Sequence, residues 1–328
     1  MTELYPLFCK PVLKDYIWGG RNLTDLGRVL PAGKKVAESW EIAAHPDGMS
    51  TAENGIYTGQ TLQALTEQLG TDLVGTRGEW ALSRGRFPLL VKLLDANQSL
   101  SVQVHPDDDY ASEHAGGDLG KAEMWVVLRA EPNAAIIYGL SKKATPEQLQ
   151  TAIKTGKLEA YLNRLPIKAG DHVCIPAGTV HALLGGAVVA EIQQNSNTTY
   201  RVYDWNRMGD DGKPRKLHIE DALQVINYDQ VGLSLPKPRQ VEKTDYWTRE
   251  ELCKNRYFTV ERVTLQAGAS YPGQCDGETM EIWGVIKGRA NVAGNPLDAV
   301  RFVLLPARSG TFSVEAPQDV VLLRAYLS

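Results

Sequence analysis

The sequence predicts a mainly β fold, with barrels of short strands and with helical insertions. Apolar runs recur at residues 88–94, 123–128 and 187–192, and each run is bounded by Gly, Pro, Asn or Asp. Short runs with such boundaries are typical of strands in a sandwich or barrel. Only residues 61–69 and 146–162 have the spacing of helices, so we expect helices as additions to a β framework.

Local signals support the second helix and one turn. Thr145 is a residue type that favours the N-cap, and Pro146 fits the first helical position, where a missing N–H costs nothing. The aspartates at 107–109 follow Pro106, and we expect them to form a solvent-exposed turn.

A short internal repeat suggests that the β unit occurs twice. Residues 123–128 resemble residues 281–286, and a second pair of five-residue blocks follows in the same order. This indicates a duplicated β-barrel, although matches this short also arise by chance. The residue five positions after the proline of the second block is His181 in the first copy and Thr311 in the second, and no histidine follows His218. We therefore expect the chemistry in the first copy alone.

A change in composition at 233–238, Leu-Ser-Leu-Pro-Lys-Pro, indicates a linker. We predict a first domain over residues 1–232 that carries the functional site and the helical insertions. A linker over 233–246 then leads to a degenerate second domain over 247–328.

Composition excludes several functions. The formal net charge of −4 offers no basic field for nucleic acid. The sequence contains no run of about 18 apolar residues, the length that a membrane span needs, and its N-terminus lacks the pattern of a signal peptide. We therefore expect a cytoplasmic protein, either a monomer or a homodimer. Its scattered cysteines are expected to be free thiols; they are Cys9, Cys174, Cys253 and Cys275.

Four polar residues form a candidate metal site. Residues 170–181 follow the pattern Gly-x5-Pro-x-Gly-x-x-His, which ends at His181. Gln103 and His105 are two apart on an alternating segment and so face the same side of a strand, and Glu123 opens the next strand. Two imidazoles, a carboxylate and an amide oxygen suit zinc, with manganese, iron or cobalt as alternatives.

Two histidines and a carboxylate leave coordination positions open, as in a catalytic zinc site. A lone histidine such as His181 more often has a hydrogen-bonded structural role. The occurrence of Gln103, His105 and Glu123 in order before it favours the interpretation of His181 as a metal ligand. The remaining histidines lack such neighbours and are expected on the surface or in loops; they are His45, His114, His172 and His218.

The 170–181 motif resembles the second motif of the cupin superfamily. More narrowly, the chain is similar to type I mannose-6-phosphate isomerases over roughly its first 210 residues, in their compact bacterial form. The last 90 residues or so match only as a degenerate cupin. The segments that carry the resemblance are 18–20, 38–41, 98–107, 120–125, 175–182 and 195–201.

The resemblance implies two cupin-type β-barrels, or jelly rolls, and interconversion of mannose 6-phosphate and fructose 6-phosphate with one zinc ion. It implies the same four metal ligands, and it matches Arg201 to the active-site arginine. It also places three residues in or near the site, namely Ser101, Lys121 and Glu191. Asn197 departs from the family, because many members have an acidic residue there.

An aldose–ketose isomerisation through a cis-enediol needs a general base. Glu191 and Lys121 are both candidates, and the sequence does not choose between them. Arg201 either holds the phosphate, stabilises the enediolate or forms a salt bridge with Asp204. Lys92 either extends its ammonium to solvent or lines the pocket.

Three rival functions are compatible with parts of this pattern. They are another cupin enzyme such as an iron-dependent oxygenase, a non-catalytic sugar-binding cupin, and a storage-type bicupin. The complete ligand set in the first half argues against the last two.

Overall fold

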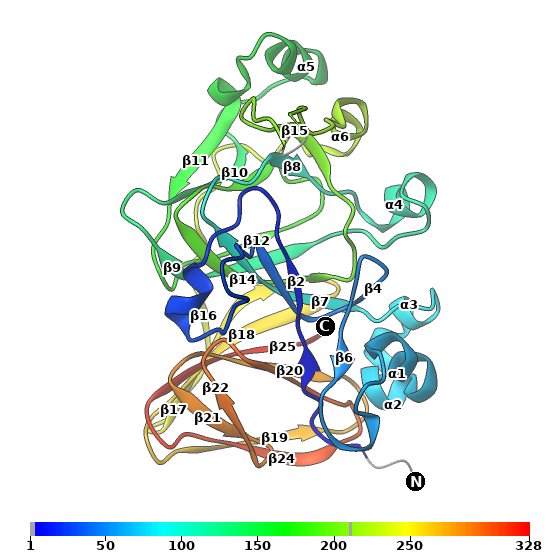
Figure 1. Ribbon diagram of the computed structural model, residues 1–328, viewed down its shortest axis with the longest axis vertical. Helices are drawn as coiled ribbons and strands as arrows, with labels where there is room; N and C mark the ends of the chain where they lie inside the picture. The colour runs from blue at the N-terminus through cyan, green and yellow to red at the C-terminus, as the bar shows by residue number, and fades with distance from the viewer. Residues whose placement is uncertain (1–3, 210–211) are drawn as a thin grey trace.

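The computed structural model describes residues 4–209 and 212–328, and it is mainly β, as predicted (Figure 1). The upper half in Figure 1 contains a six-stranded and a five-stranded sheet. The six-stranded sheet has the order β12 (His172–Ile175), β9 (Glu123–Ala130), β14 (Ala187–Gln194), β7 (Leu89–Ala96), β3 (Glu38–Ile42) and β2 (Val12–Lys14). The five-stranded sheet has the order β11 (Leu162–Pro166), β10 (Ala135–Leu140), β13 (His181–Leu183), β8 (Val102–Val104) and β15 (Tyr200–Tyr203).

The lower half repeats this plan with a six-stranded and a four-stranded sheet. The larger sheet has the order β16 (Arg239–Lys243), β17 (Trp247–Lys254), β18 (Phe258–Leu265), β25 (Val320–Leu327), β20 (Glu281–Lys287) and β23 (Phe302–Leu305). The smaller has the order β19 (Ser270–Cys275), β24 (Gly310–Glu315), β21 (Arg289–Val292) and β22 (Asn295–Asp298). Two short pairs complete the strands: β1 (Cys9–Lys10) with β6 (Thr51–Ala52), and β4 (Ala44–His45) with β5 (Gly48–Met49).

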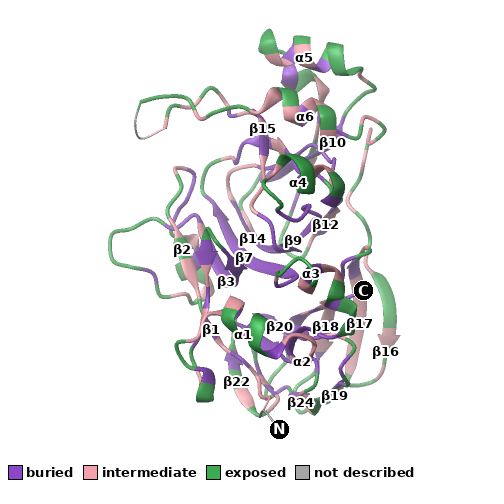
Figure 2. Cartoon of the chain, turned by 90° about the vertical axis from the view of Figure 1, so that its right-hand side faces the viewer, coloured by how far each residue is buried: buried purple, intermediate pink, exposed green. Residues whose placement is uncertain are grey.

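The two six-stranded sheets pack against each other through one shared core. Leu93 and Val126 of the upper sheet belong to the same buried cluster as Val260, Ile282 and Leu323 of the lower sheet. Alternate residues of the upper sheet, such as Trp125 and Leu94, point the other way, into a second cluster shared with the five-stranded sheet. Strands β7 and β14 are therefore buried on both faces along their whole length (Figure 2), which explains why their sequences are mostly apolar and do not alternate with polar residues.

The two predicted helices are present with one change of length. Helix α1 (Leu62–Leu69) begins after Thr61, whose side chain caps it. Helix α5 (Pro146–Lys154) begins with a capping box of Thr145 and Gln148. It ends before residue 162, because Gly156 adopts a φ of 67°, which breaks the helix before η4 (Leu158–Tyr161).

Several short helices carried no clear sequence signal. They are α2 (Thr71–Val74), α3 (Glu79–Leu82), α4 (Asp108–His114) and α6 (Ile219–Val225), with 3₁₀ turns η1 (Asn22–Leu26), η2 (Gly55–Tyr57) and η3 (Thr76–Gly78). The expected turn at 107–109 is in fact the start of α4. Asp107 caps this helix, and Asp108 is buried instead of solvent-exposed. None of the helices in the described residues is long and apolar enough to span a bilayer.

The expectation of four free thiols is wrong for two of the cysteines. Cys174 on β12 and Cys253 on β17 form a disulfide, with 5.6 Å between their Cα atoms. Their strands come from different halves of the chain and are brought together by the packing of the two sheets. Cys9 and Cys275 are free and buried.

Candidate active site

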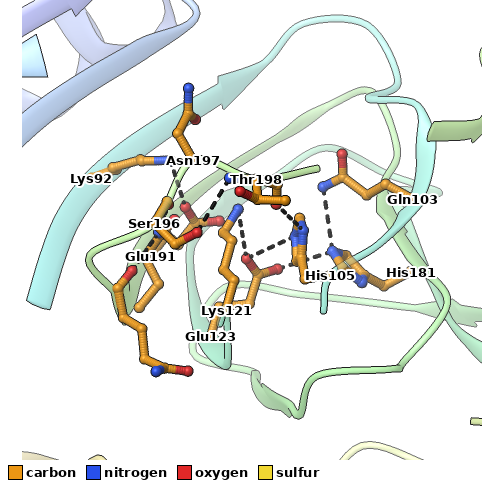
Figure 3. Close-up of polar contacts among 12 residues, drawn as sticks. Lys92, Gln103, His105, Lys121, Glu123, His181, Glu191, Ser196, Asn197 and Thr198 are labelled. Carbon is orange, nitrogen blue, oxygen red and sulfur yellow. Dashed lines mark hydrogen bonds and ion pairs between the residues drawn. The ribbon is translucent and has the colours of Figure 1, made fainter. Parts of the chain in front are cut away.

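Three of the predicted metal ligands meet inside the upper pair of sheets (Figure 3). His105 follows β8, Glu123 opens β9 and His181 opens β13. Nε2 of His181 lies 3.0 Å from one carboxylate oxygen of Glu123, and Nε2 of His105 lies 3.3 Å from the other. All candidate ligand atoms lie within 4.8 Å of one another, and each residue is at most 1% exposed.

The polar atoms of this cluster fit a metal ion. Nε2 of His105 and both carboxylate oxygens of Glu123 are buried and make no hydrogen bond of good geometry, which is costly unless another partner binds them. Burial, followed by the charge of Lys121, lowers the pKa of His105 to about 3, so its imidazole is neutral, as a ligand must be. Burial alone would raise the pKa of Glu123, but Lys121 and the imidazoles hold it well below its usual range.

Backbone carbonyls orient both imidazole rings. Nδ1 of His105 lies 2.9 Å from the carbonyl oxygen of Thr198, and Nδ1 of His181 lies 2.8 Å from that of Thr179. A carbonyl only accepts, so Nδ1 carries the proton in each ring and Nε2 keeps its lone pair for a ligand.

Gln103 is the fourth predicted ligand, and it lies beside His181. The two residues pair directly across β8 and β13, and Nε2 of Gln103 is 3.3 Å from Nε2 of His181. Because amide oxygen and nitrogen are nearly isosteric, a half-turn of this amide would direct its oxygen toward the cluster instead.

A row of buried charges continues from the cluster. The Lys121 ammonium lies 3.2 Å from Glu123. On the adjacent strands, the Lys92 ammonium lies 3.3 Å from Glu191 and 3.6 Å from Glu38. Trp125 donates an indole N–H to the other oxygen of Glu191, at 2.7 Å.

Burial and neighbouring charges shift the pKa values of the side chains in this row. Burial raises the pKa of Glu191, against the opposing charge of Lys92. Burial would lower the pKa of Lys92, but Glu38 and Glu191 outweigh it and raise this pKa. Of the two roles expected for Lys92, lining the pocket is confirmed, since this residue is 2% exposed.

A pocket of about 350 Å³ opens beside the cluster. It is lined by five of the residues predicted as catalytic, substrate-binding or metal-binding, which are Ser101, Gln103, Lys121, Glu191 and Arg201. The structure therefore brings the predicted catalytic and substrate-binding residues to one cavity, next to the three buried ligands.

Arg201 lies on β15, where it pairs with Gln103 of β8. Its Nε is buried without a hydrogen-bond partner, and burial, followed by the charge of Arg215, lowers its pKa. The alternative of a salt bridge with Asp204 is wrong, because Asp204 is paired with Arg207 and Arg215. An arginine that lines a pocket, has a buried Nε and has no carboxylate partner among the described residues is suited to bind an anion.

Sequence reasoning missed some residues of this pocket. Glu38, Arg215 and His218 line it; His218 lies in a loop, as expected, but no pocket role was predicted for it. His45 and His172 are also buried, contrary to expectation. Glu38 lies in segment 38–41, which carries the family resemblance, but the resemblance gave it no role. No local motif marks the other positions, because they come from segments that only the fold brings together.

The matching interior of the lower half holds no comparable ligand set. Trp283 contacts Phe312 edge-on, as Trp125 contacts His181. Phe312, not the predicted Thr311, therefore occupies the place of His181. Among the described residues, the only group of three or more His, Cys, Asp or Glu side chains close enough to hold a metal is the one in the upper half.

Comparisons with known proteins agree on one family. Residues 6–119 match the family model described as phosphomannose isomerase type I, catalytic domain. Two Bacillus subtilis proteins, the probable mannose-6-phosphate isomerase GmuF and the mannose-6-phosphate isomerase ManA, are 39% and 38% identical to the chain, each over 97% of this chain and 98% of the relative. The crystal structure of the mannose 6-phosphate isomerase from Bacillus subtilis superposes with a TM-score of 0.85 and 36% identity, over 98% of this chain and 99% of the other.

Proposed function

Since the chain belongs to the type I phosphomannose isomerase family, we propose that it interconverts mannose 6-phosphate and fructose 6-phosphate in a metal-dependent reaction. The observation that carries the metal dependence is the buried cluster of His105, Glu123 and His181, in which Nε2 of His105 and both carboxylate oxygens of Glu123 lack hydrogen-bond partners. The cluster adjoins a pocket rich in cations, which suits a sugar phosphate.

We propose zinc as the metal, held by these three residues and by the amide oxygen of Gln103. Two neutral imidazoles with a carboxylate and an amide form a mixed nitrogen and oxygen set that suits zinc. When bound, the metal would polarise the sugar carbonyl as a Lewis acid.

The side chains of the pocket would hold the substrate. Arg201 has a buried Nε without a partner, and we assign it to the phosphate or to the enediolate oxygens, because a guanidinium fork matches oxyanions. Lys121 and Ser101 line the same pocket and would bind substrate oxygens. Arg201 lies on β15 of the five-stranded sheet and Lys121 lies two residues before β9 of the six-stranded sheet, so a substrate that contacts both would be held across the cavity.

We assign the transfer of the proton between carbons 1 and 2, through a cis-enediol, to Glu191. Both Glu191 and Lys121 line the pocket, but two observations favour Glu191. One of its oxygens makes no hydrogen bond, and Trp125 fixes the other. Lys121 is instead paired with the candidate ligand Glu123 at 3.2 Å.

We interpret the two halves as two cupin-type barrels, with the first domain over 1–232, a linker over 233–246 and a second domain over 247–328. The pairing of two sheets around a core in each half supports this division. The aromatic ring of Phe312 in the place of His181 supports the view that the second barrel carries no site. A cytoplasmic location and the oligomeric state stay predictions.

The test is a coupled assay with mannose 6-phosphate on metal-stripped protein and on the same protein restored with zinc. We expect activity to be lost with the metal and to return with about one equivalent of zinc. Full activity after complete metal removal would refute the catalytic metal. Zinc binding with no turnover would favour a sugar-binding protein, and oxygen-dependent chemistry with iron would favour an oxygenase.

A further inference from the structure

The segment between β14 and β15 is tied to the proposed metal centre by its backbone. The carbonyl of Thr198 lies in this segment and accepts the proton of Nδ1 from His105, at 2.9 Å (Figure 3). The direction of the His105 lone pair therefore depends on where this irregular segment lies. Residues 195–199 belong to no strand, so sheet hydrogen bonds do not fix them.

The carboxylate of Asp118 binds three successive residues of this segment. Oδ2 of Asp118 accepts hydrogen bonds from the hydroxyl groups of Ser196 and Thr198, each at 3.0 Å, and from the backbone N–H of Asn197 at 3.3 Å. Asp118 is 9% exposed, and Nε2 of His45 lies 3.6 Å behind the same oxygen. Asp118 touches neither the pocket nor the ligand cluster, so the proposed reaction gives it no role.

The chemistry of the contact requires an ionised acceptor. Three donors converge on one oxygen, which a carboxylate accommodates and a neutral amide does not. Burial alone would raise the pKa of Asp118, but the nearby His45 imidazole and the hydrogen bonds from the two hydroxyl groups hold it below its usual value. The charge is thus maintained at the point where the segment is anchored.

We propose that Asp118 is a positioning residue for the metal centre. It fixes residues 196–198 so that the Thr198 carbonyl holds His105 in the tautomer and orientation that direct Nε2 to the metal. The inference rests on the proposed metal-dependent function and extends it. Side chains that orient a ligating histidine typically change metal affinity 10- to 100-fold when they are removed.

The test compares zinc affinity in two variants that break the anchor from opposite sides. Asp118→Asn keeps the shape of the side chain and removes the charge, whereas S196A/T198V keeps Asp118 and removes the two hydroxyl donors. We expect both to weaken zinc binding by about tenfold. The combined variant should show little further loss, because all three changes remove one anchor.

The matched control is Asp95→Asn. Asp95 is a fully buried carboxylate of the same half that accepts two hydrogen bonds from Asn22, at 2.6 and 2.8 Å. Its loss should lower thermal stability without changing zinc affinity. The dissociation constant is measured on full-length apo protein by competition with a chromophoric chelator, and the visible spectrum of the cobalt-loaded protein reports the ligand geometry.

A zinc dissociation constant within twofold of wild type in Asp118→Asn overturns the inference. So does an equal loss in the Asp95→Asn control, or losses that add in the combined variant. A changed cobalt spectrum confined to the anchor variants supports it. Zinc affinity is measured without substrate, so a wild type that binds zinc but does not isomerise mannose 6-phosphate would refute the proposed function and leave this test intact.

Discussion

Glu191→Gln separates proton transfer from every other role of the active site. The substitution conserves shape, and a glutamine oxygen still accepts the Trp125 indole N–H, which is 2.7 Å from Glu191. It removes one anionic partner of Lys92, but Glu38 remains 3.6 Å away and the ring of Trp40 lies 4.8 Å from the same ammonium. We therefore expect the free energy of unfolding to fall by only about 1–3 kcal/mol.

The expected effect on turnover is much larger. A general base contributes about 10²- to 10⁴-fold, so kcat should fall at least 100-fold, which corresponds to about 2.7 kcal/mol of transition-state free energy. KM and bound zinc should change little, because neither Arg201 nor the metal ligands are altered. The assay is steady-state isomerisation at matched metal content, together with exchange of the substrate proton in deuterated water.

The control for the buried ion pair is Glu38→Gln, which removes the other carboxylate partner of Lys92. Its kcat should fall by less than tenfold if Lys92 only needs one carboxylate. A Glu191→Gln variant that keeps more than a tenth of the wild-type kcat with zinc bound would refute the assignment. Proton exchange that continues while isomerisation is lost would also show that Glu191 does not remove the proton from carbon.

Three further changes test other parts of the molecule. His181→Ala should abolish metal binding and activity together, measured by metal analysis and the coupled assay, and activity without metal would contradict the proposed centre. Lys121→Ala should raise KM more than it lowers kcat, whereas a large loss of kcat at unchanged KM would point to proton transfer. Asp108→Asn removes the charge and one of the two carboxylate oxygens, which accept bonds from donors that include the Tyr257 hydroxyl at 2.6 Å, and it should cost about 2 kcal/mol of unfolding free energy at pH 7. Burial would raise the pKa of Asp108, but its hydrogen bonds lower it, so the difference from wild type should shrink as pH falls below about 4 in denaturant titrations; a difference independent of pH would contradict this reasoning.

The parts of the site that sequence predicts are those with a local period. Gln103 and His105 are two residues apart, and alternation along a strand alone places them on one face. The apolar runs predict strands because each is short and bounded by turn-forming residues. The sequences of those strands do not predict what covers their second face, since the lower sheet that packs on β7 and β14 comes from the other end of the chain.

Contacts between distant segments were missed because no spacing encodes them. Cys174 and Cys253 are separated by 79 residues, and Asp108 meets Tyr257 across 149. The error at Thr311 has a different origin. A shift of one residue along a strand moves every side chain to the opposite face, so counting from the proline selected the neighbour of Phe312.

At one equivalent strand position the upper half has an anionic residue and the lower half a cationic one. This difference explains why the carboxylate beside that position is free for a metal only in the upper half. Glu191 pairs with Trp125 across β14 and β9, and in the lower half Arg324 pairs with Trp283 across β25 and β20 in the same way.

Because the lower position is a cation, it binds the carboxylate beside it. Arg324 donates to Glu281 at 2.9 Å and to Glu261 at 3.3 Å, and Trp283 donates a third bond to Glu281 at 2.7 Å. In the upper half the cation has moved one strand over, to Lys92, where it pairs with Glu38 and Glu191. Glu123, the counterpart of Glu281, therefore keeps both oxygens without a hydrogen bond, and its nearest cation is Lys121 at 3.2 Å. A cation at position 191 would bind Glu123 as Arg324 binds Glu281, so we expect the anionic residue there to be a condition for the proposed metal centre as well as the proposed base.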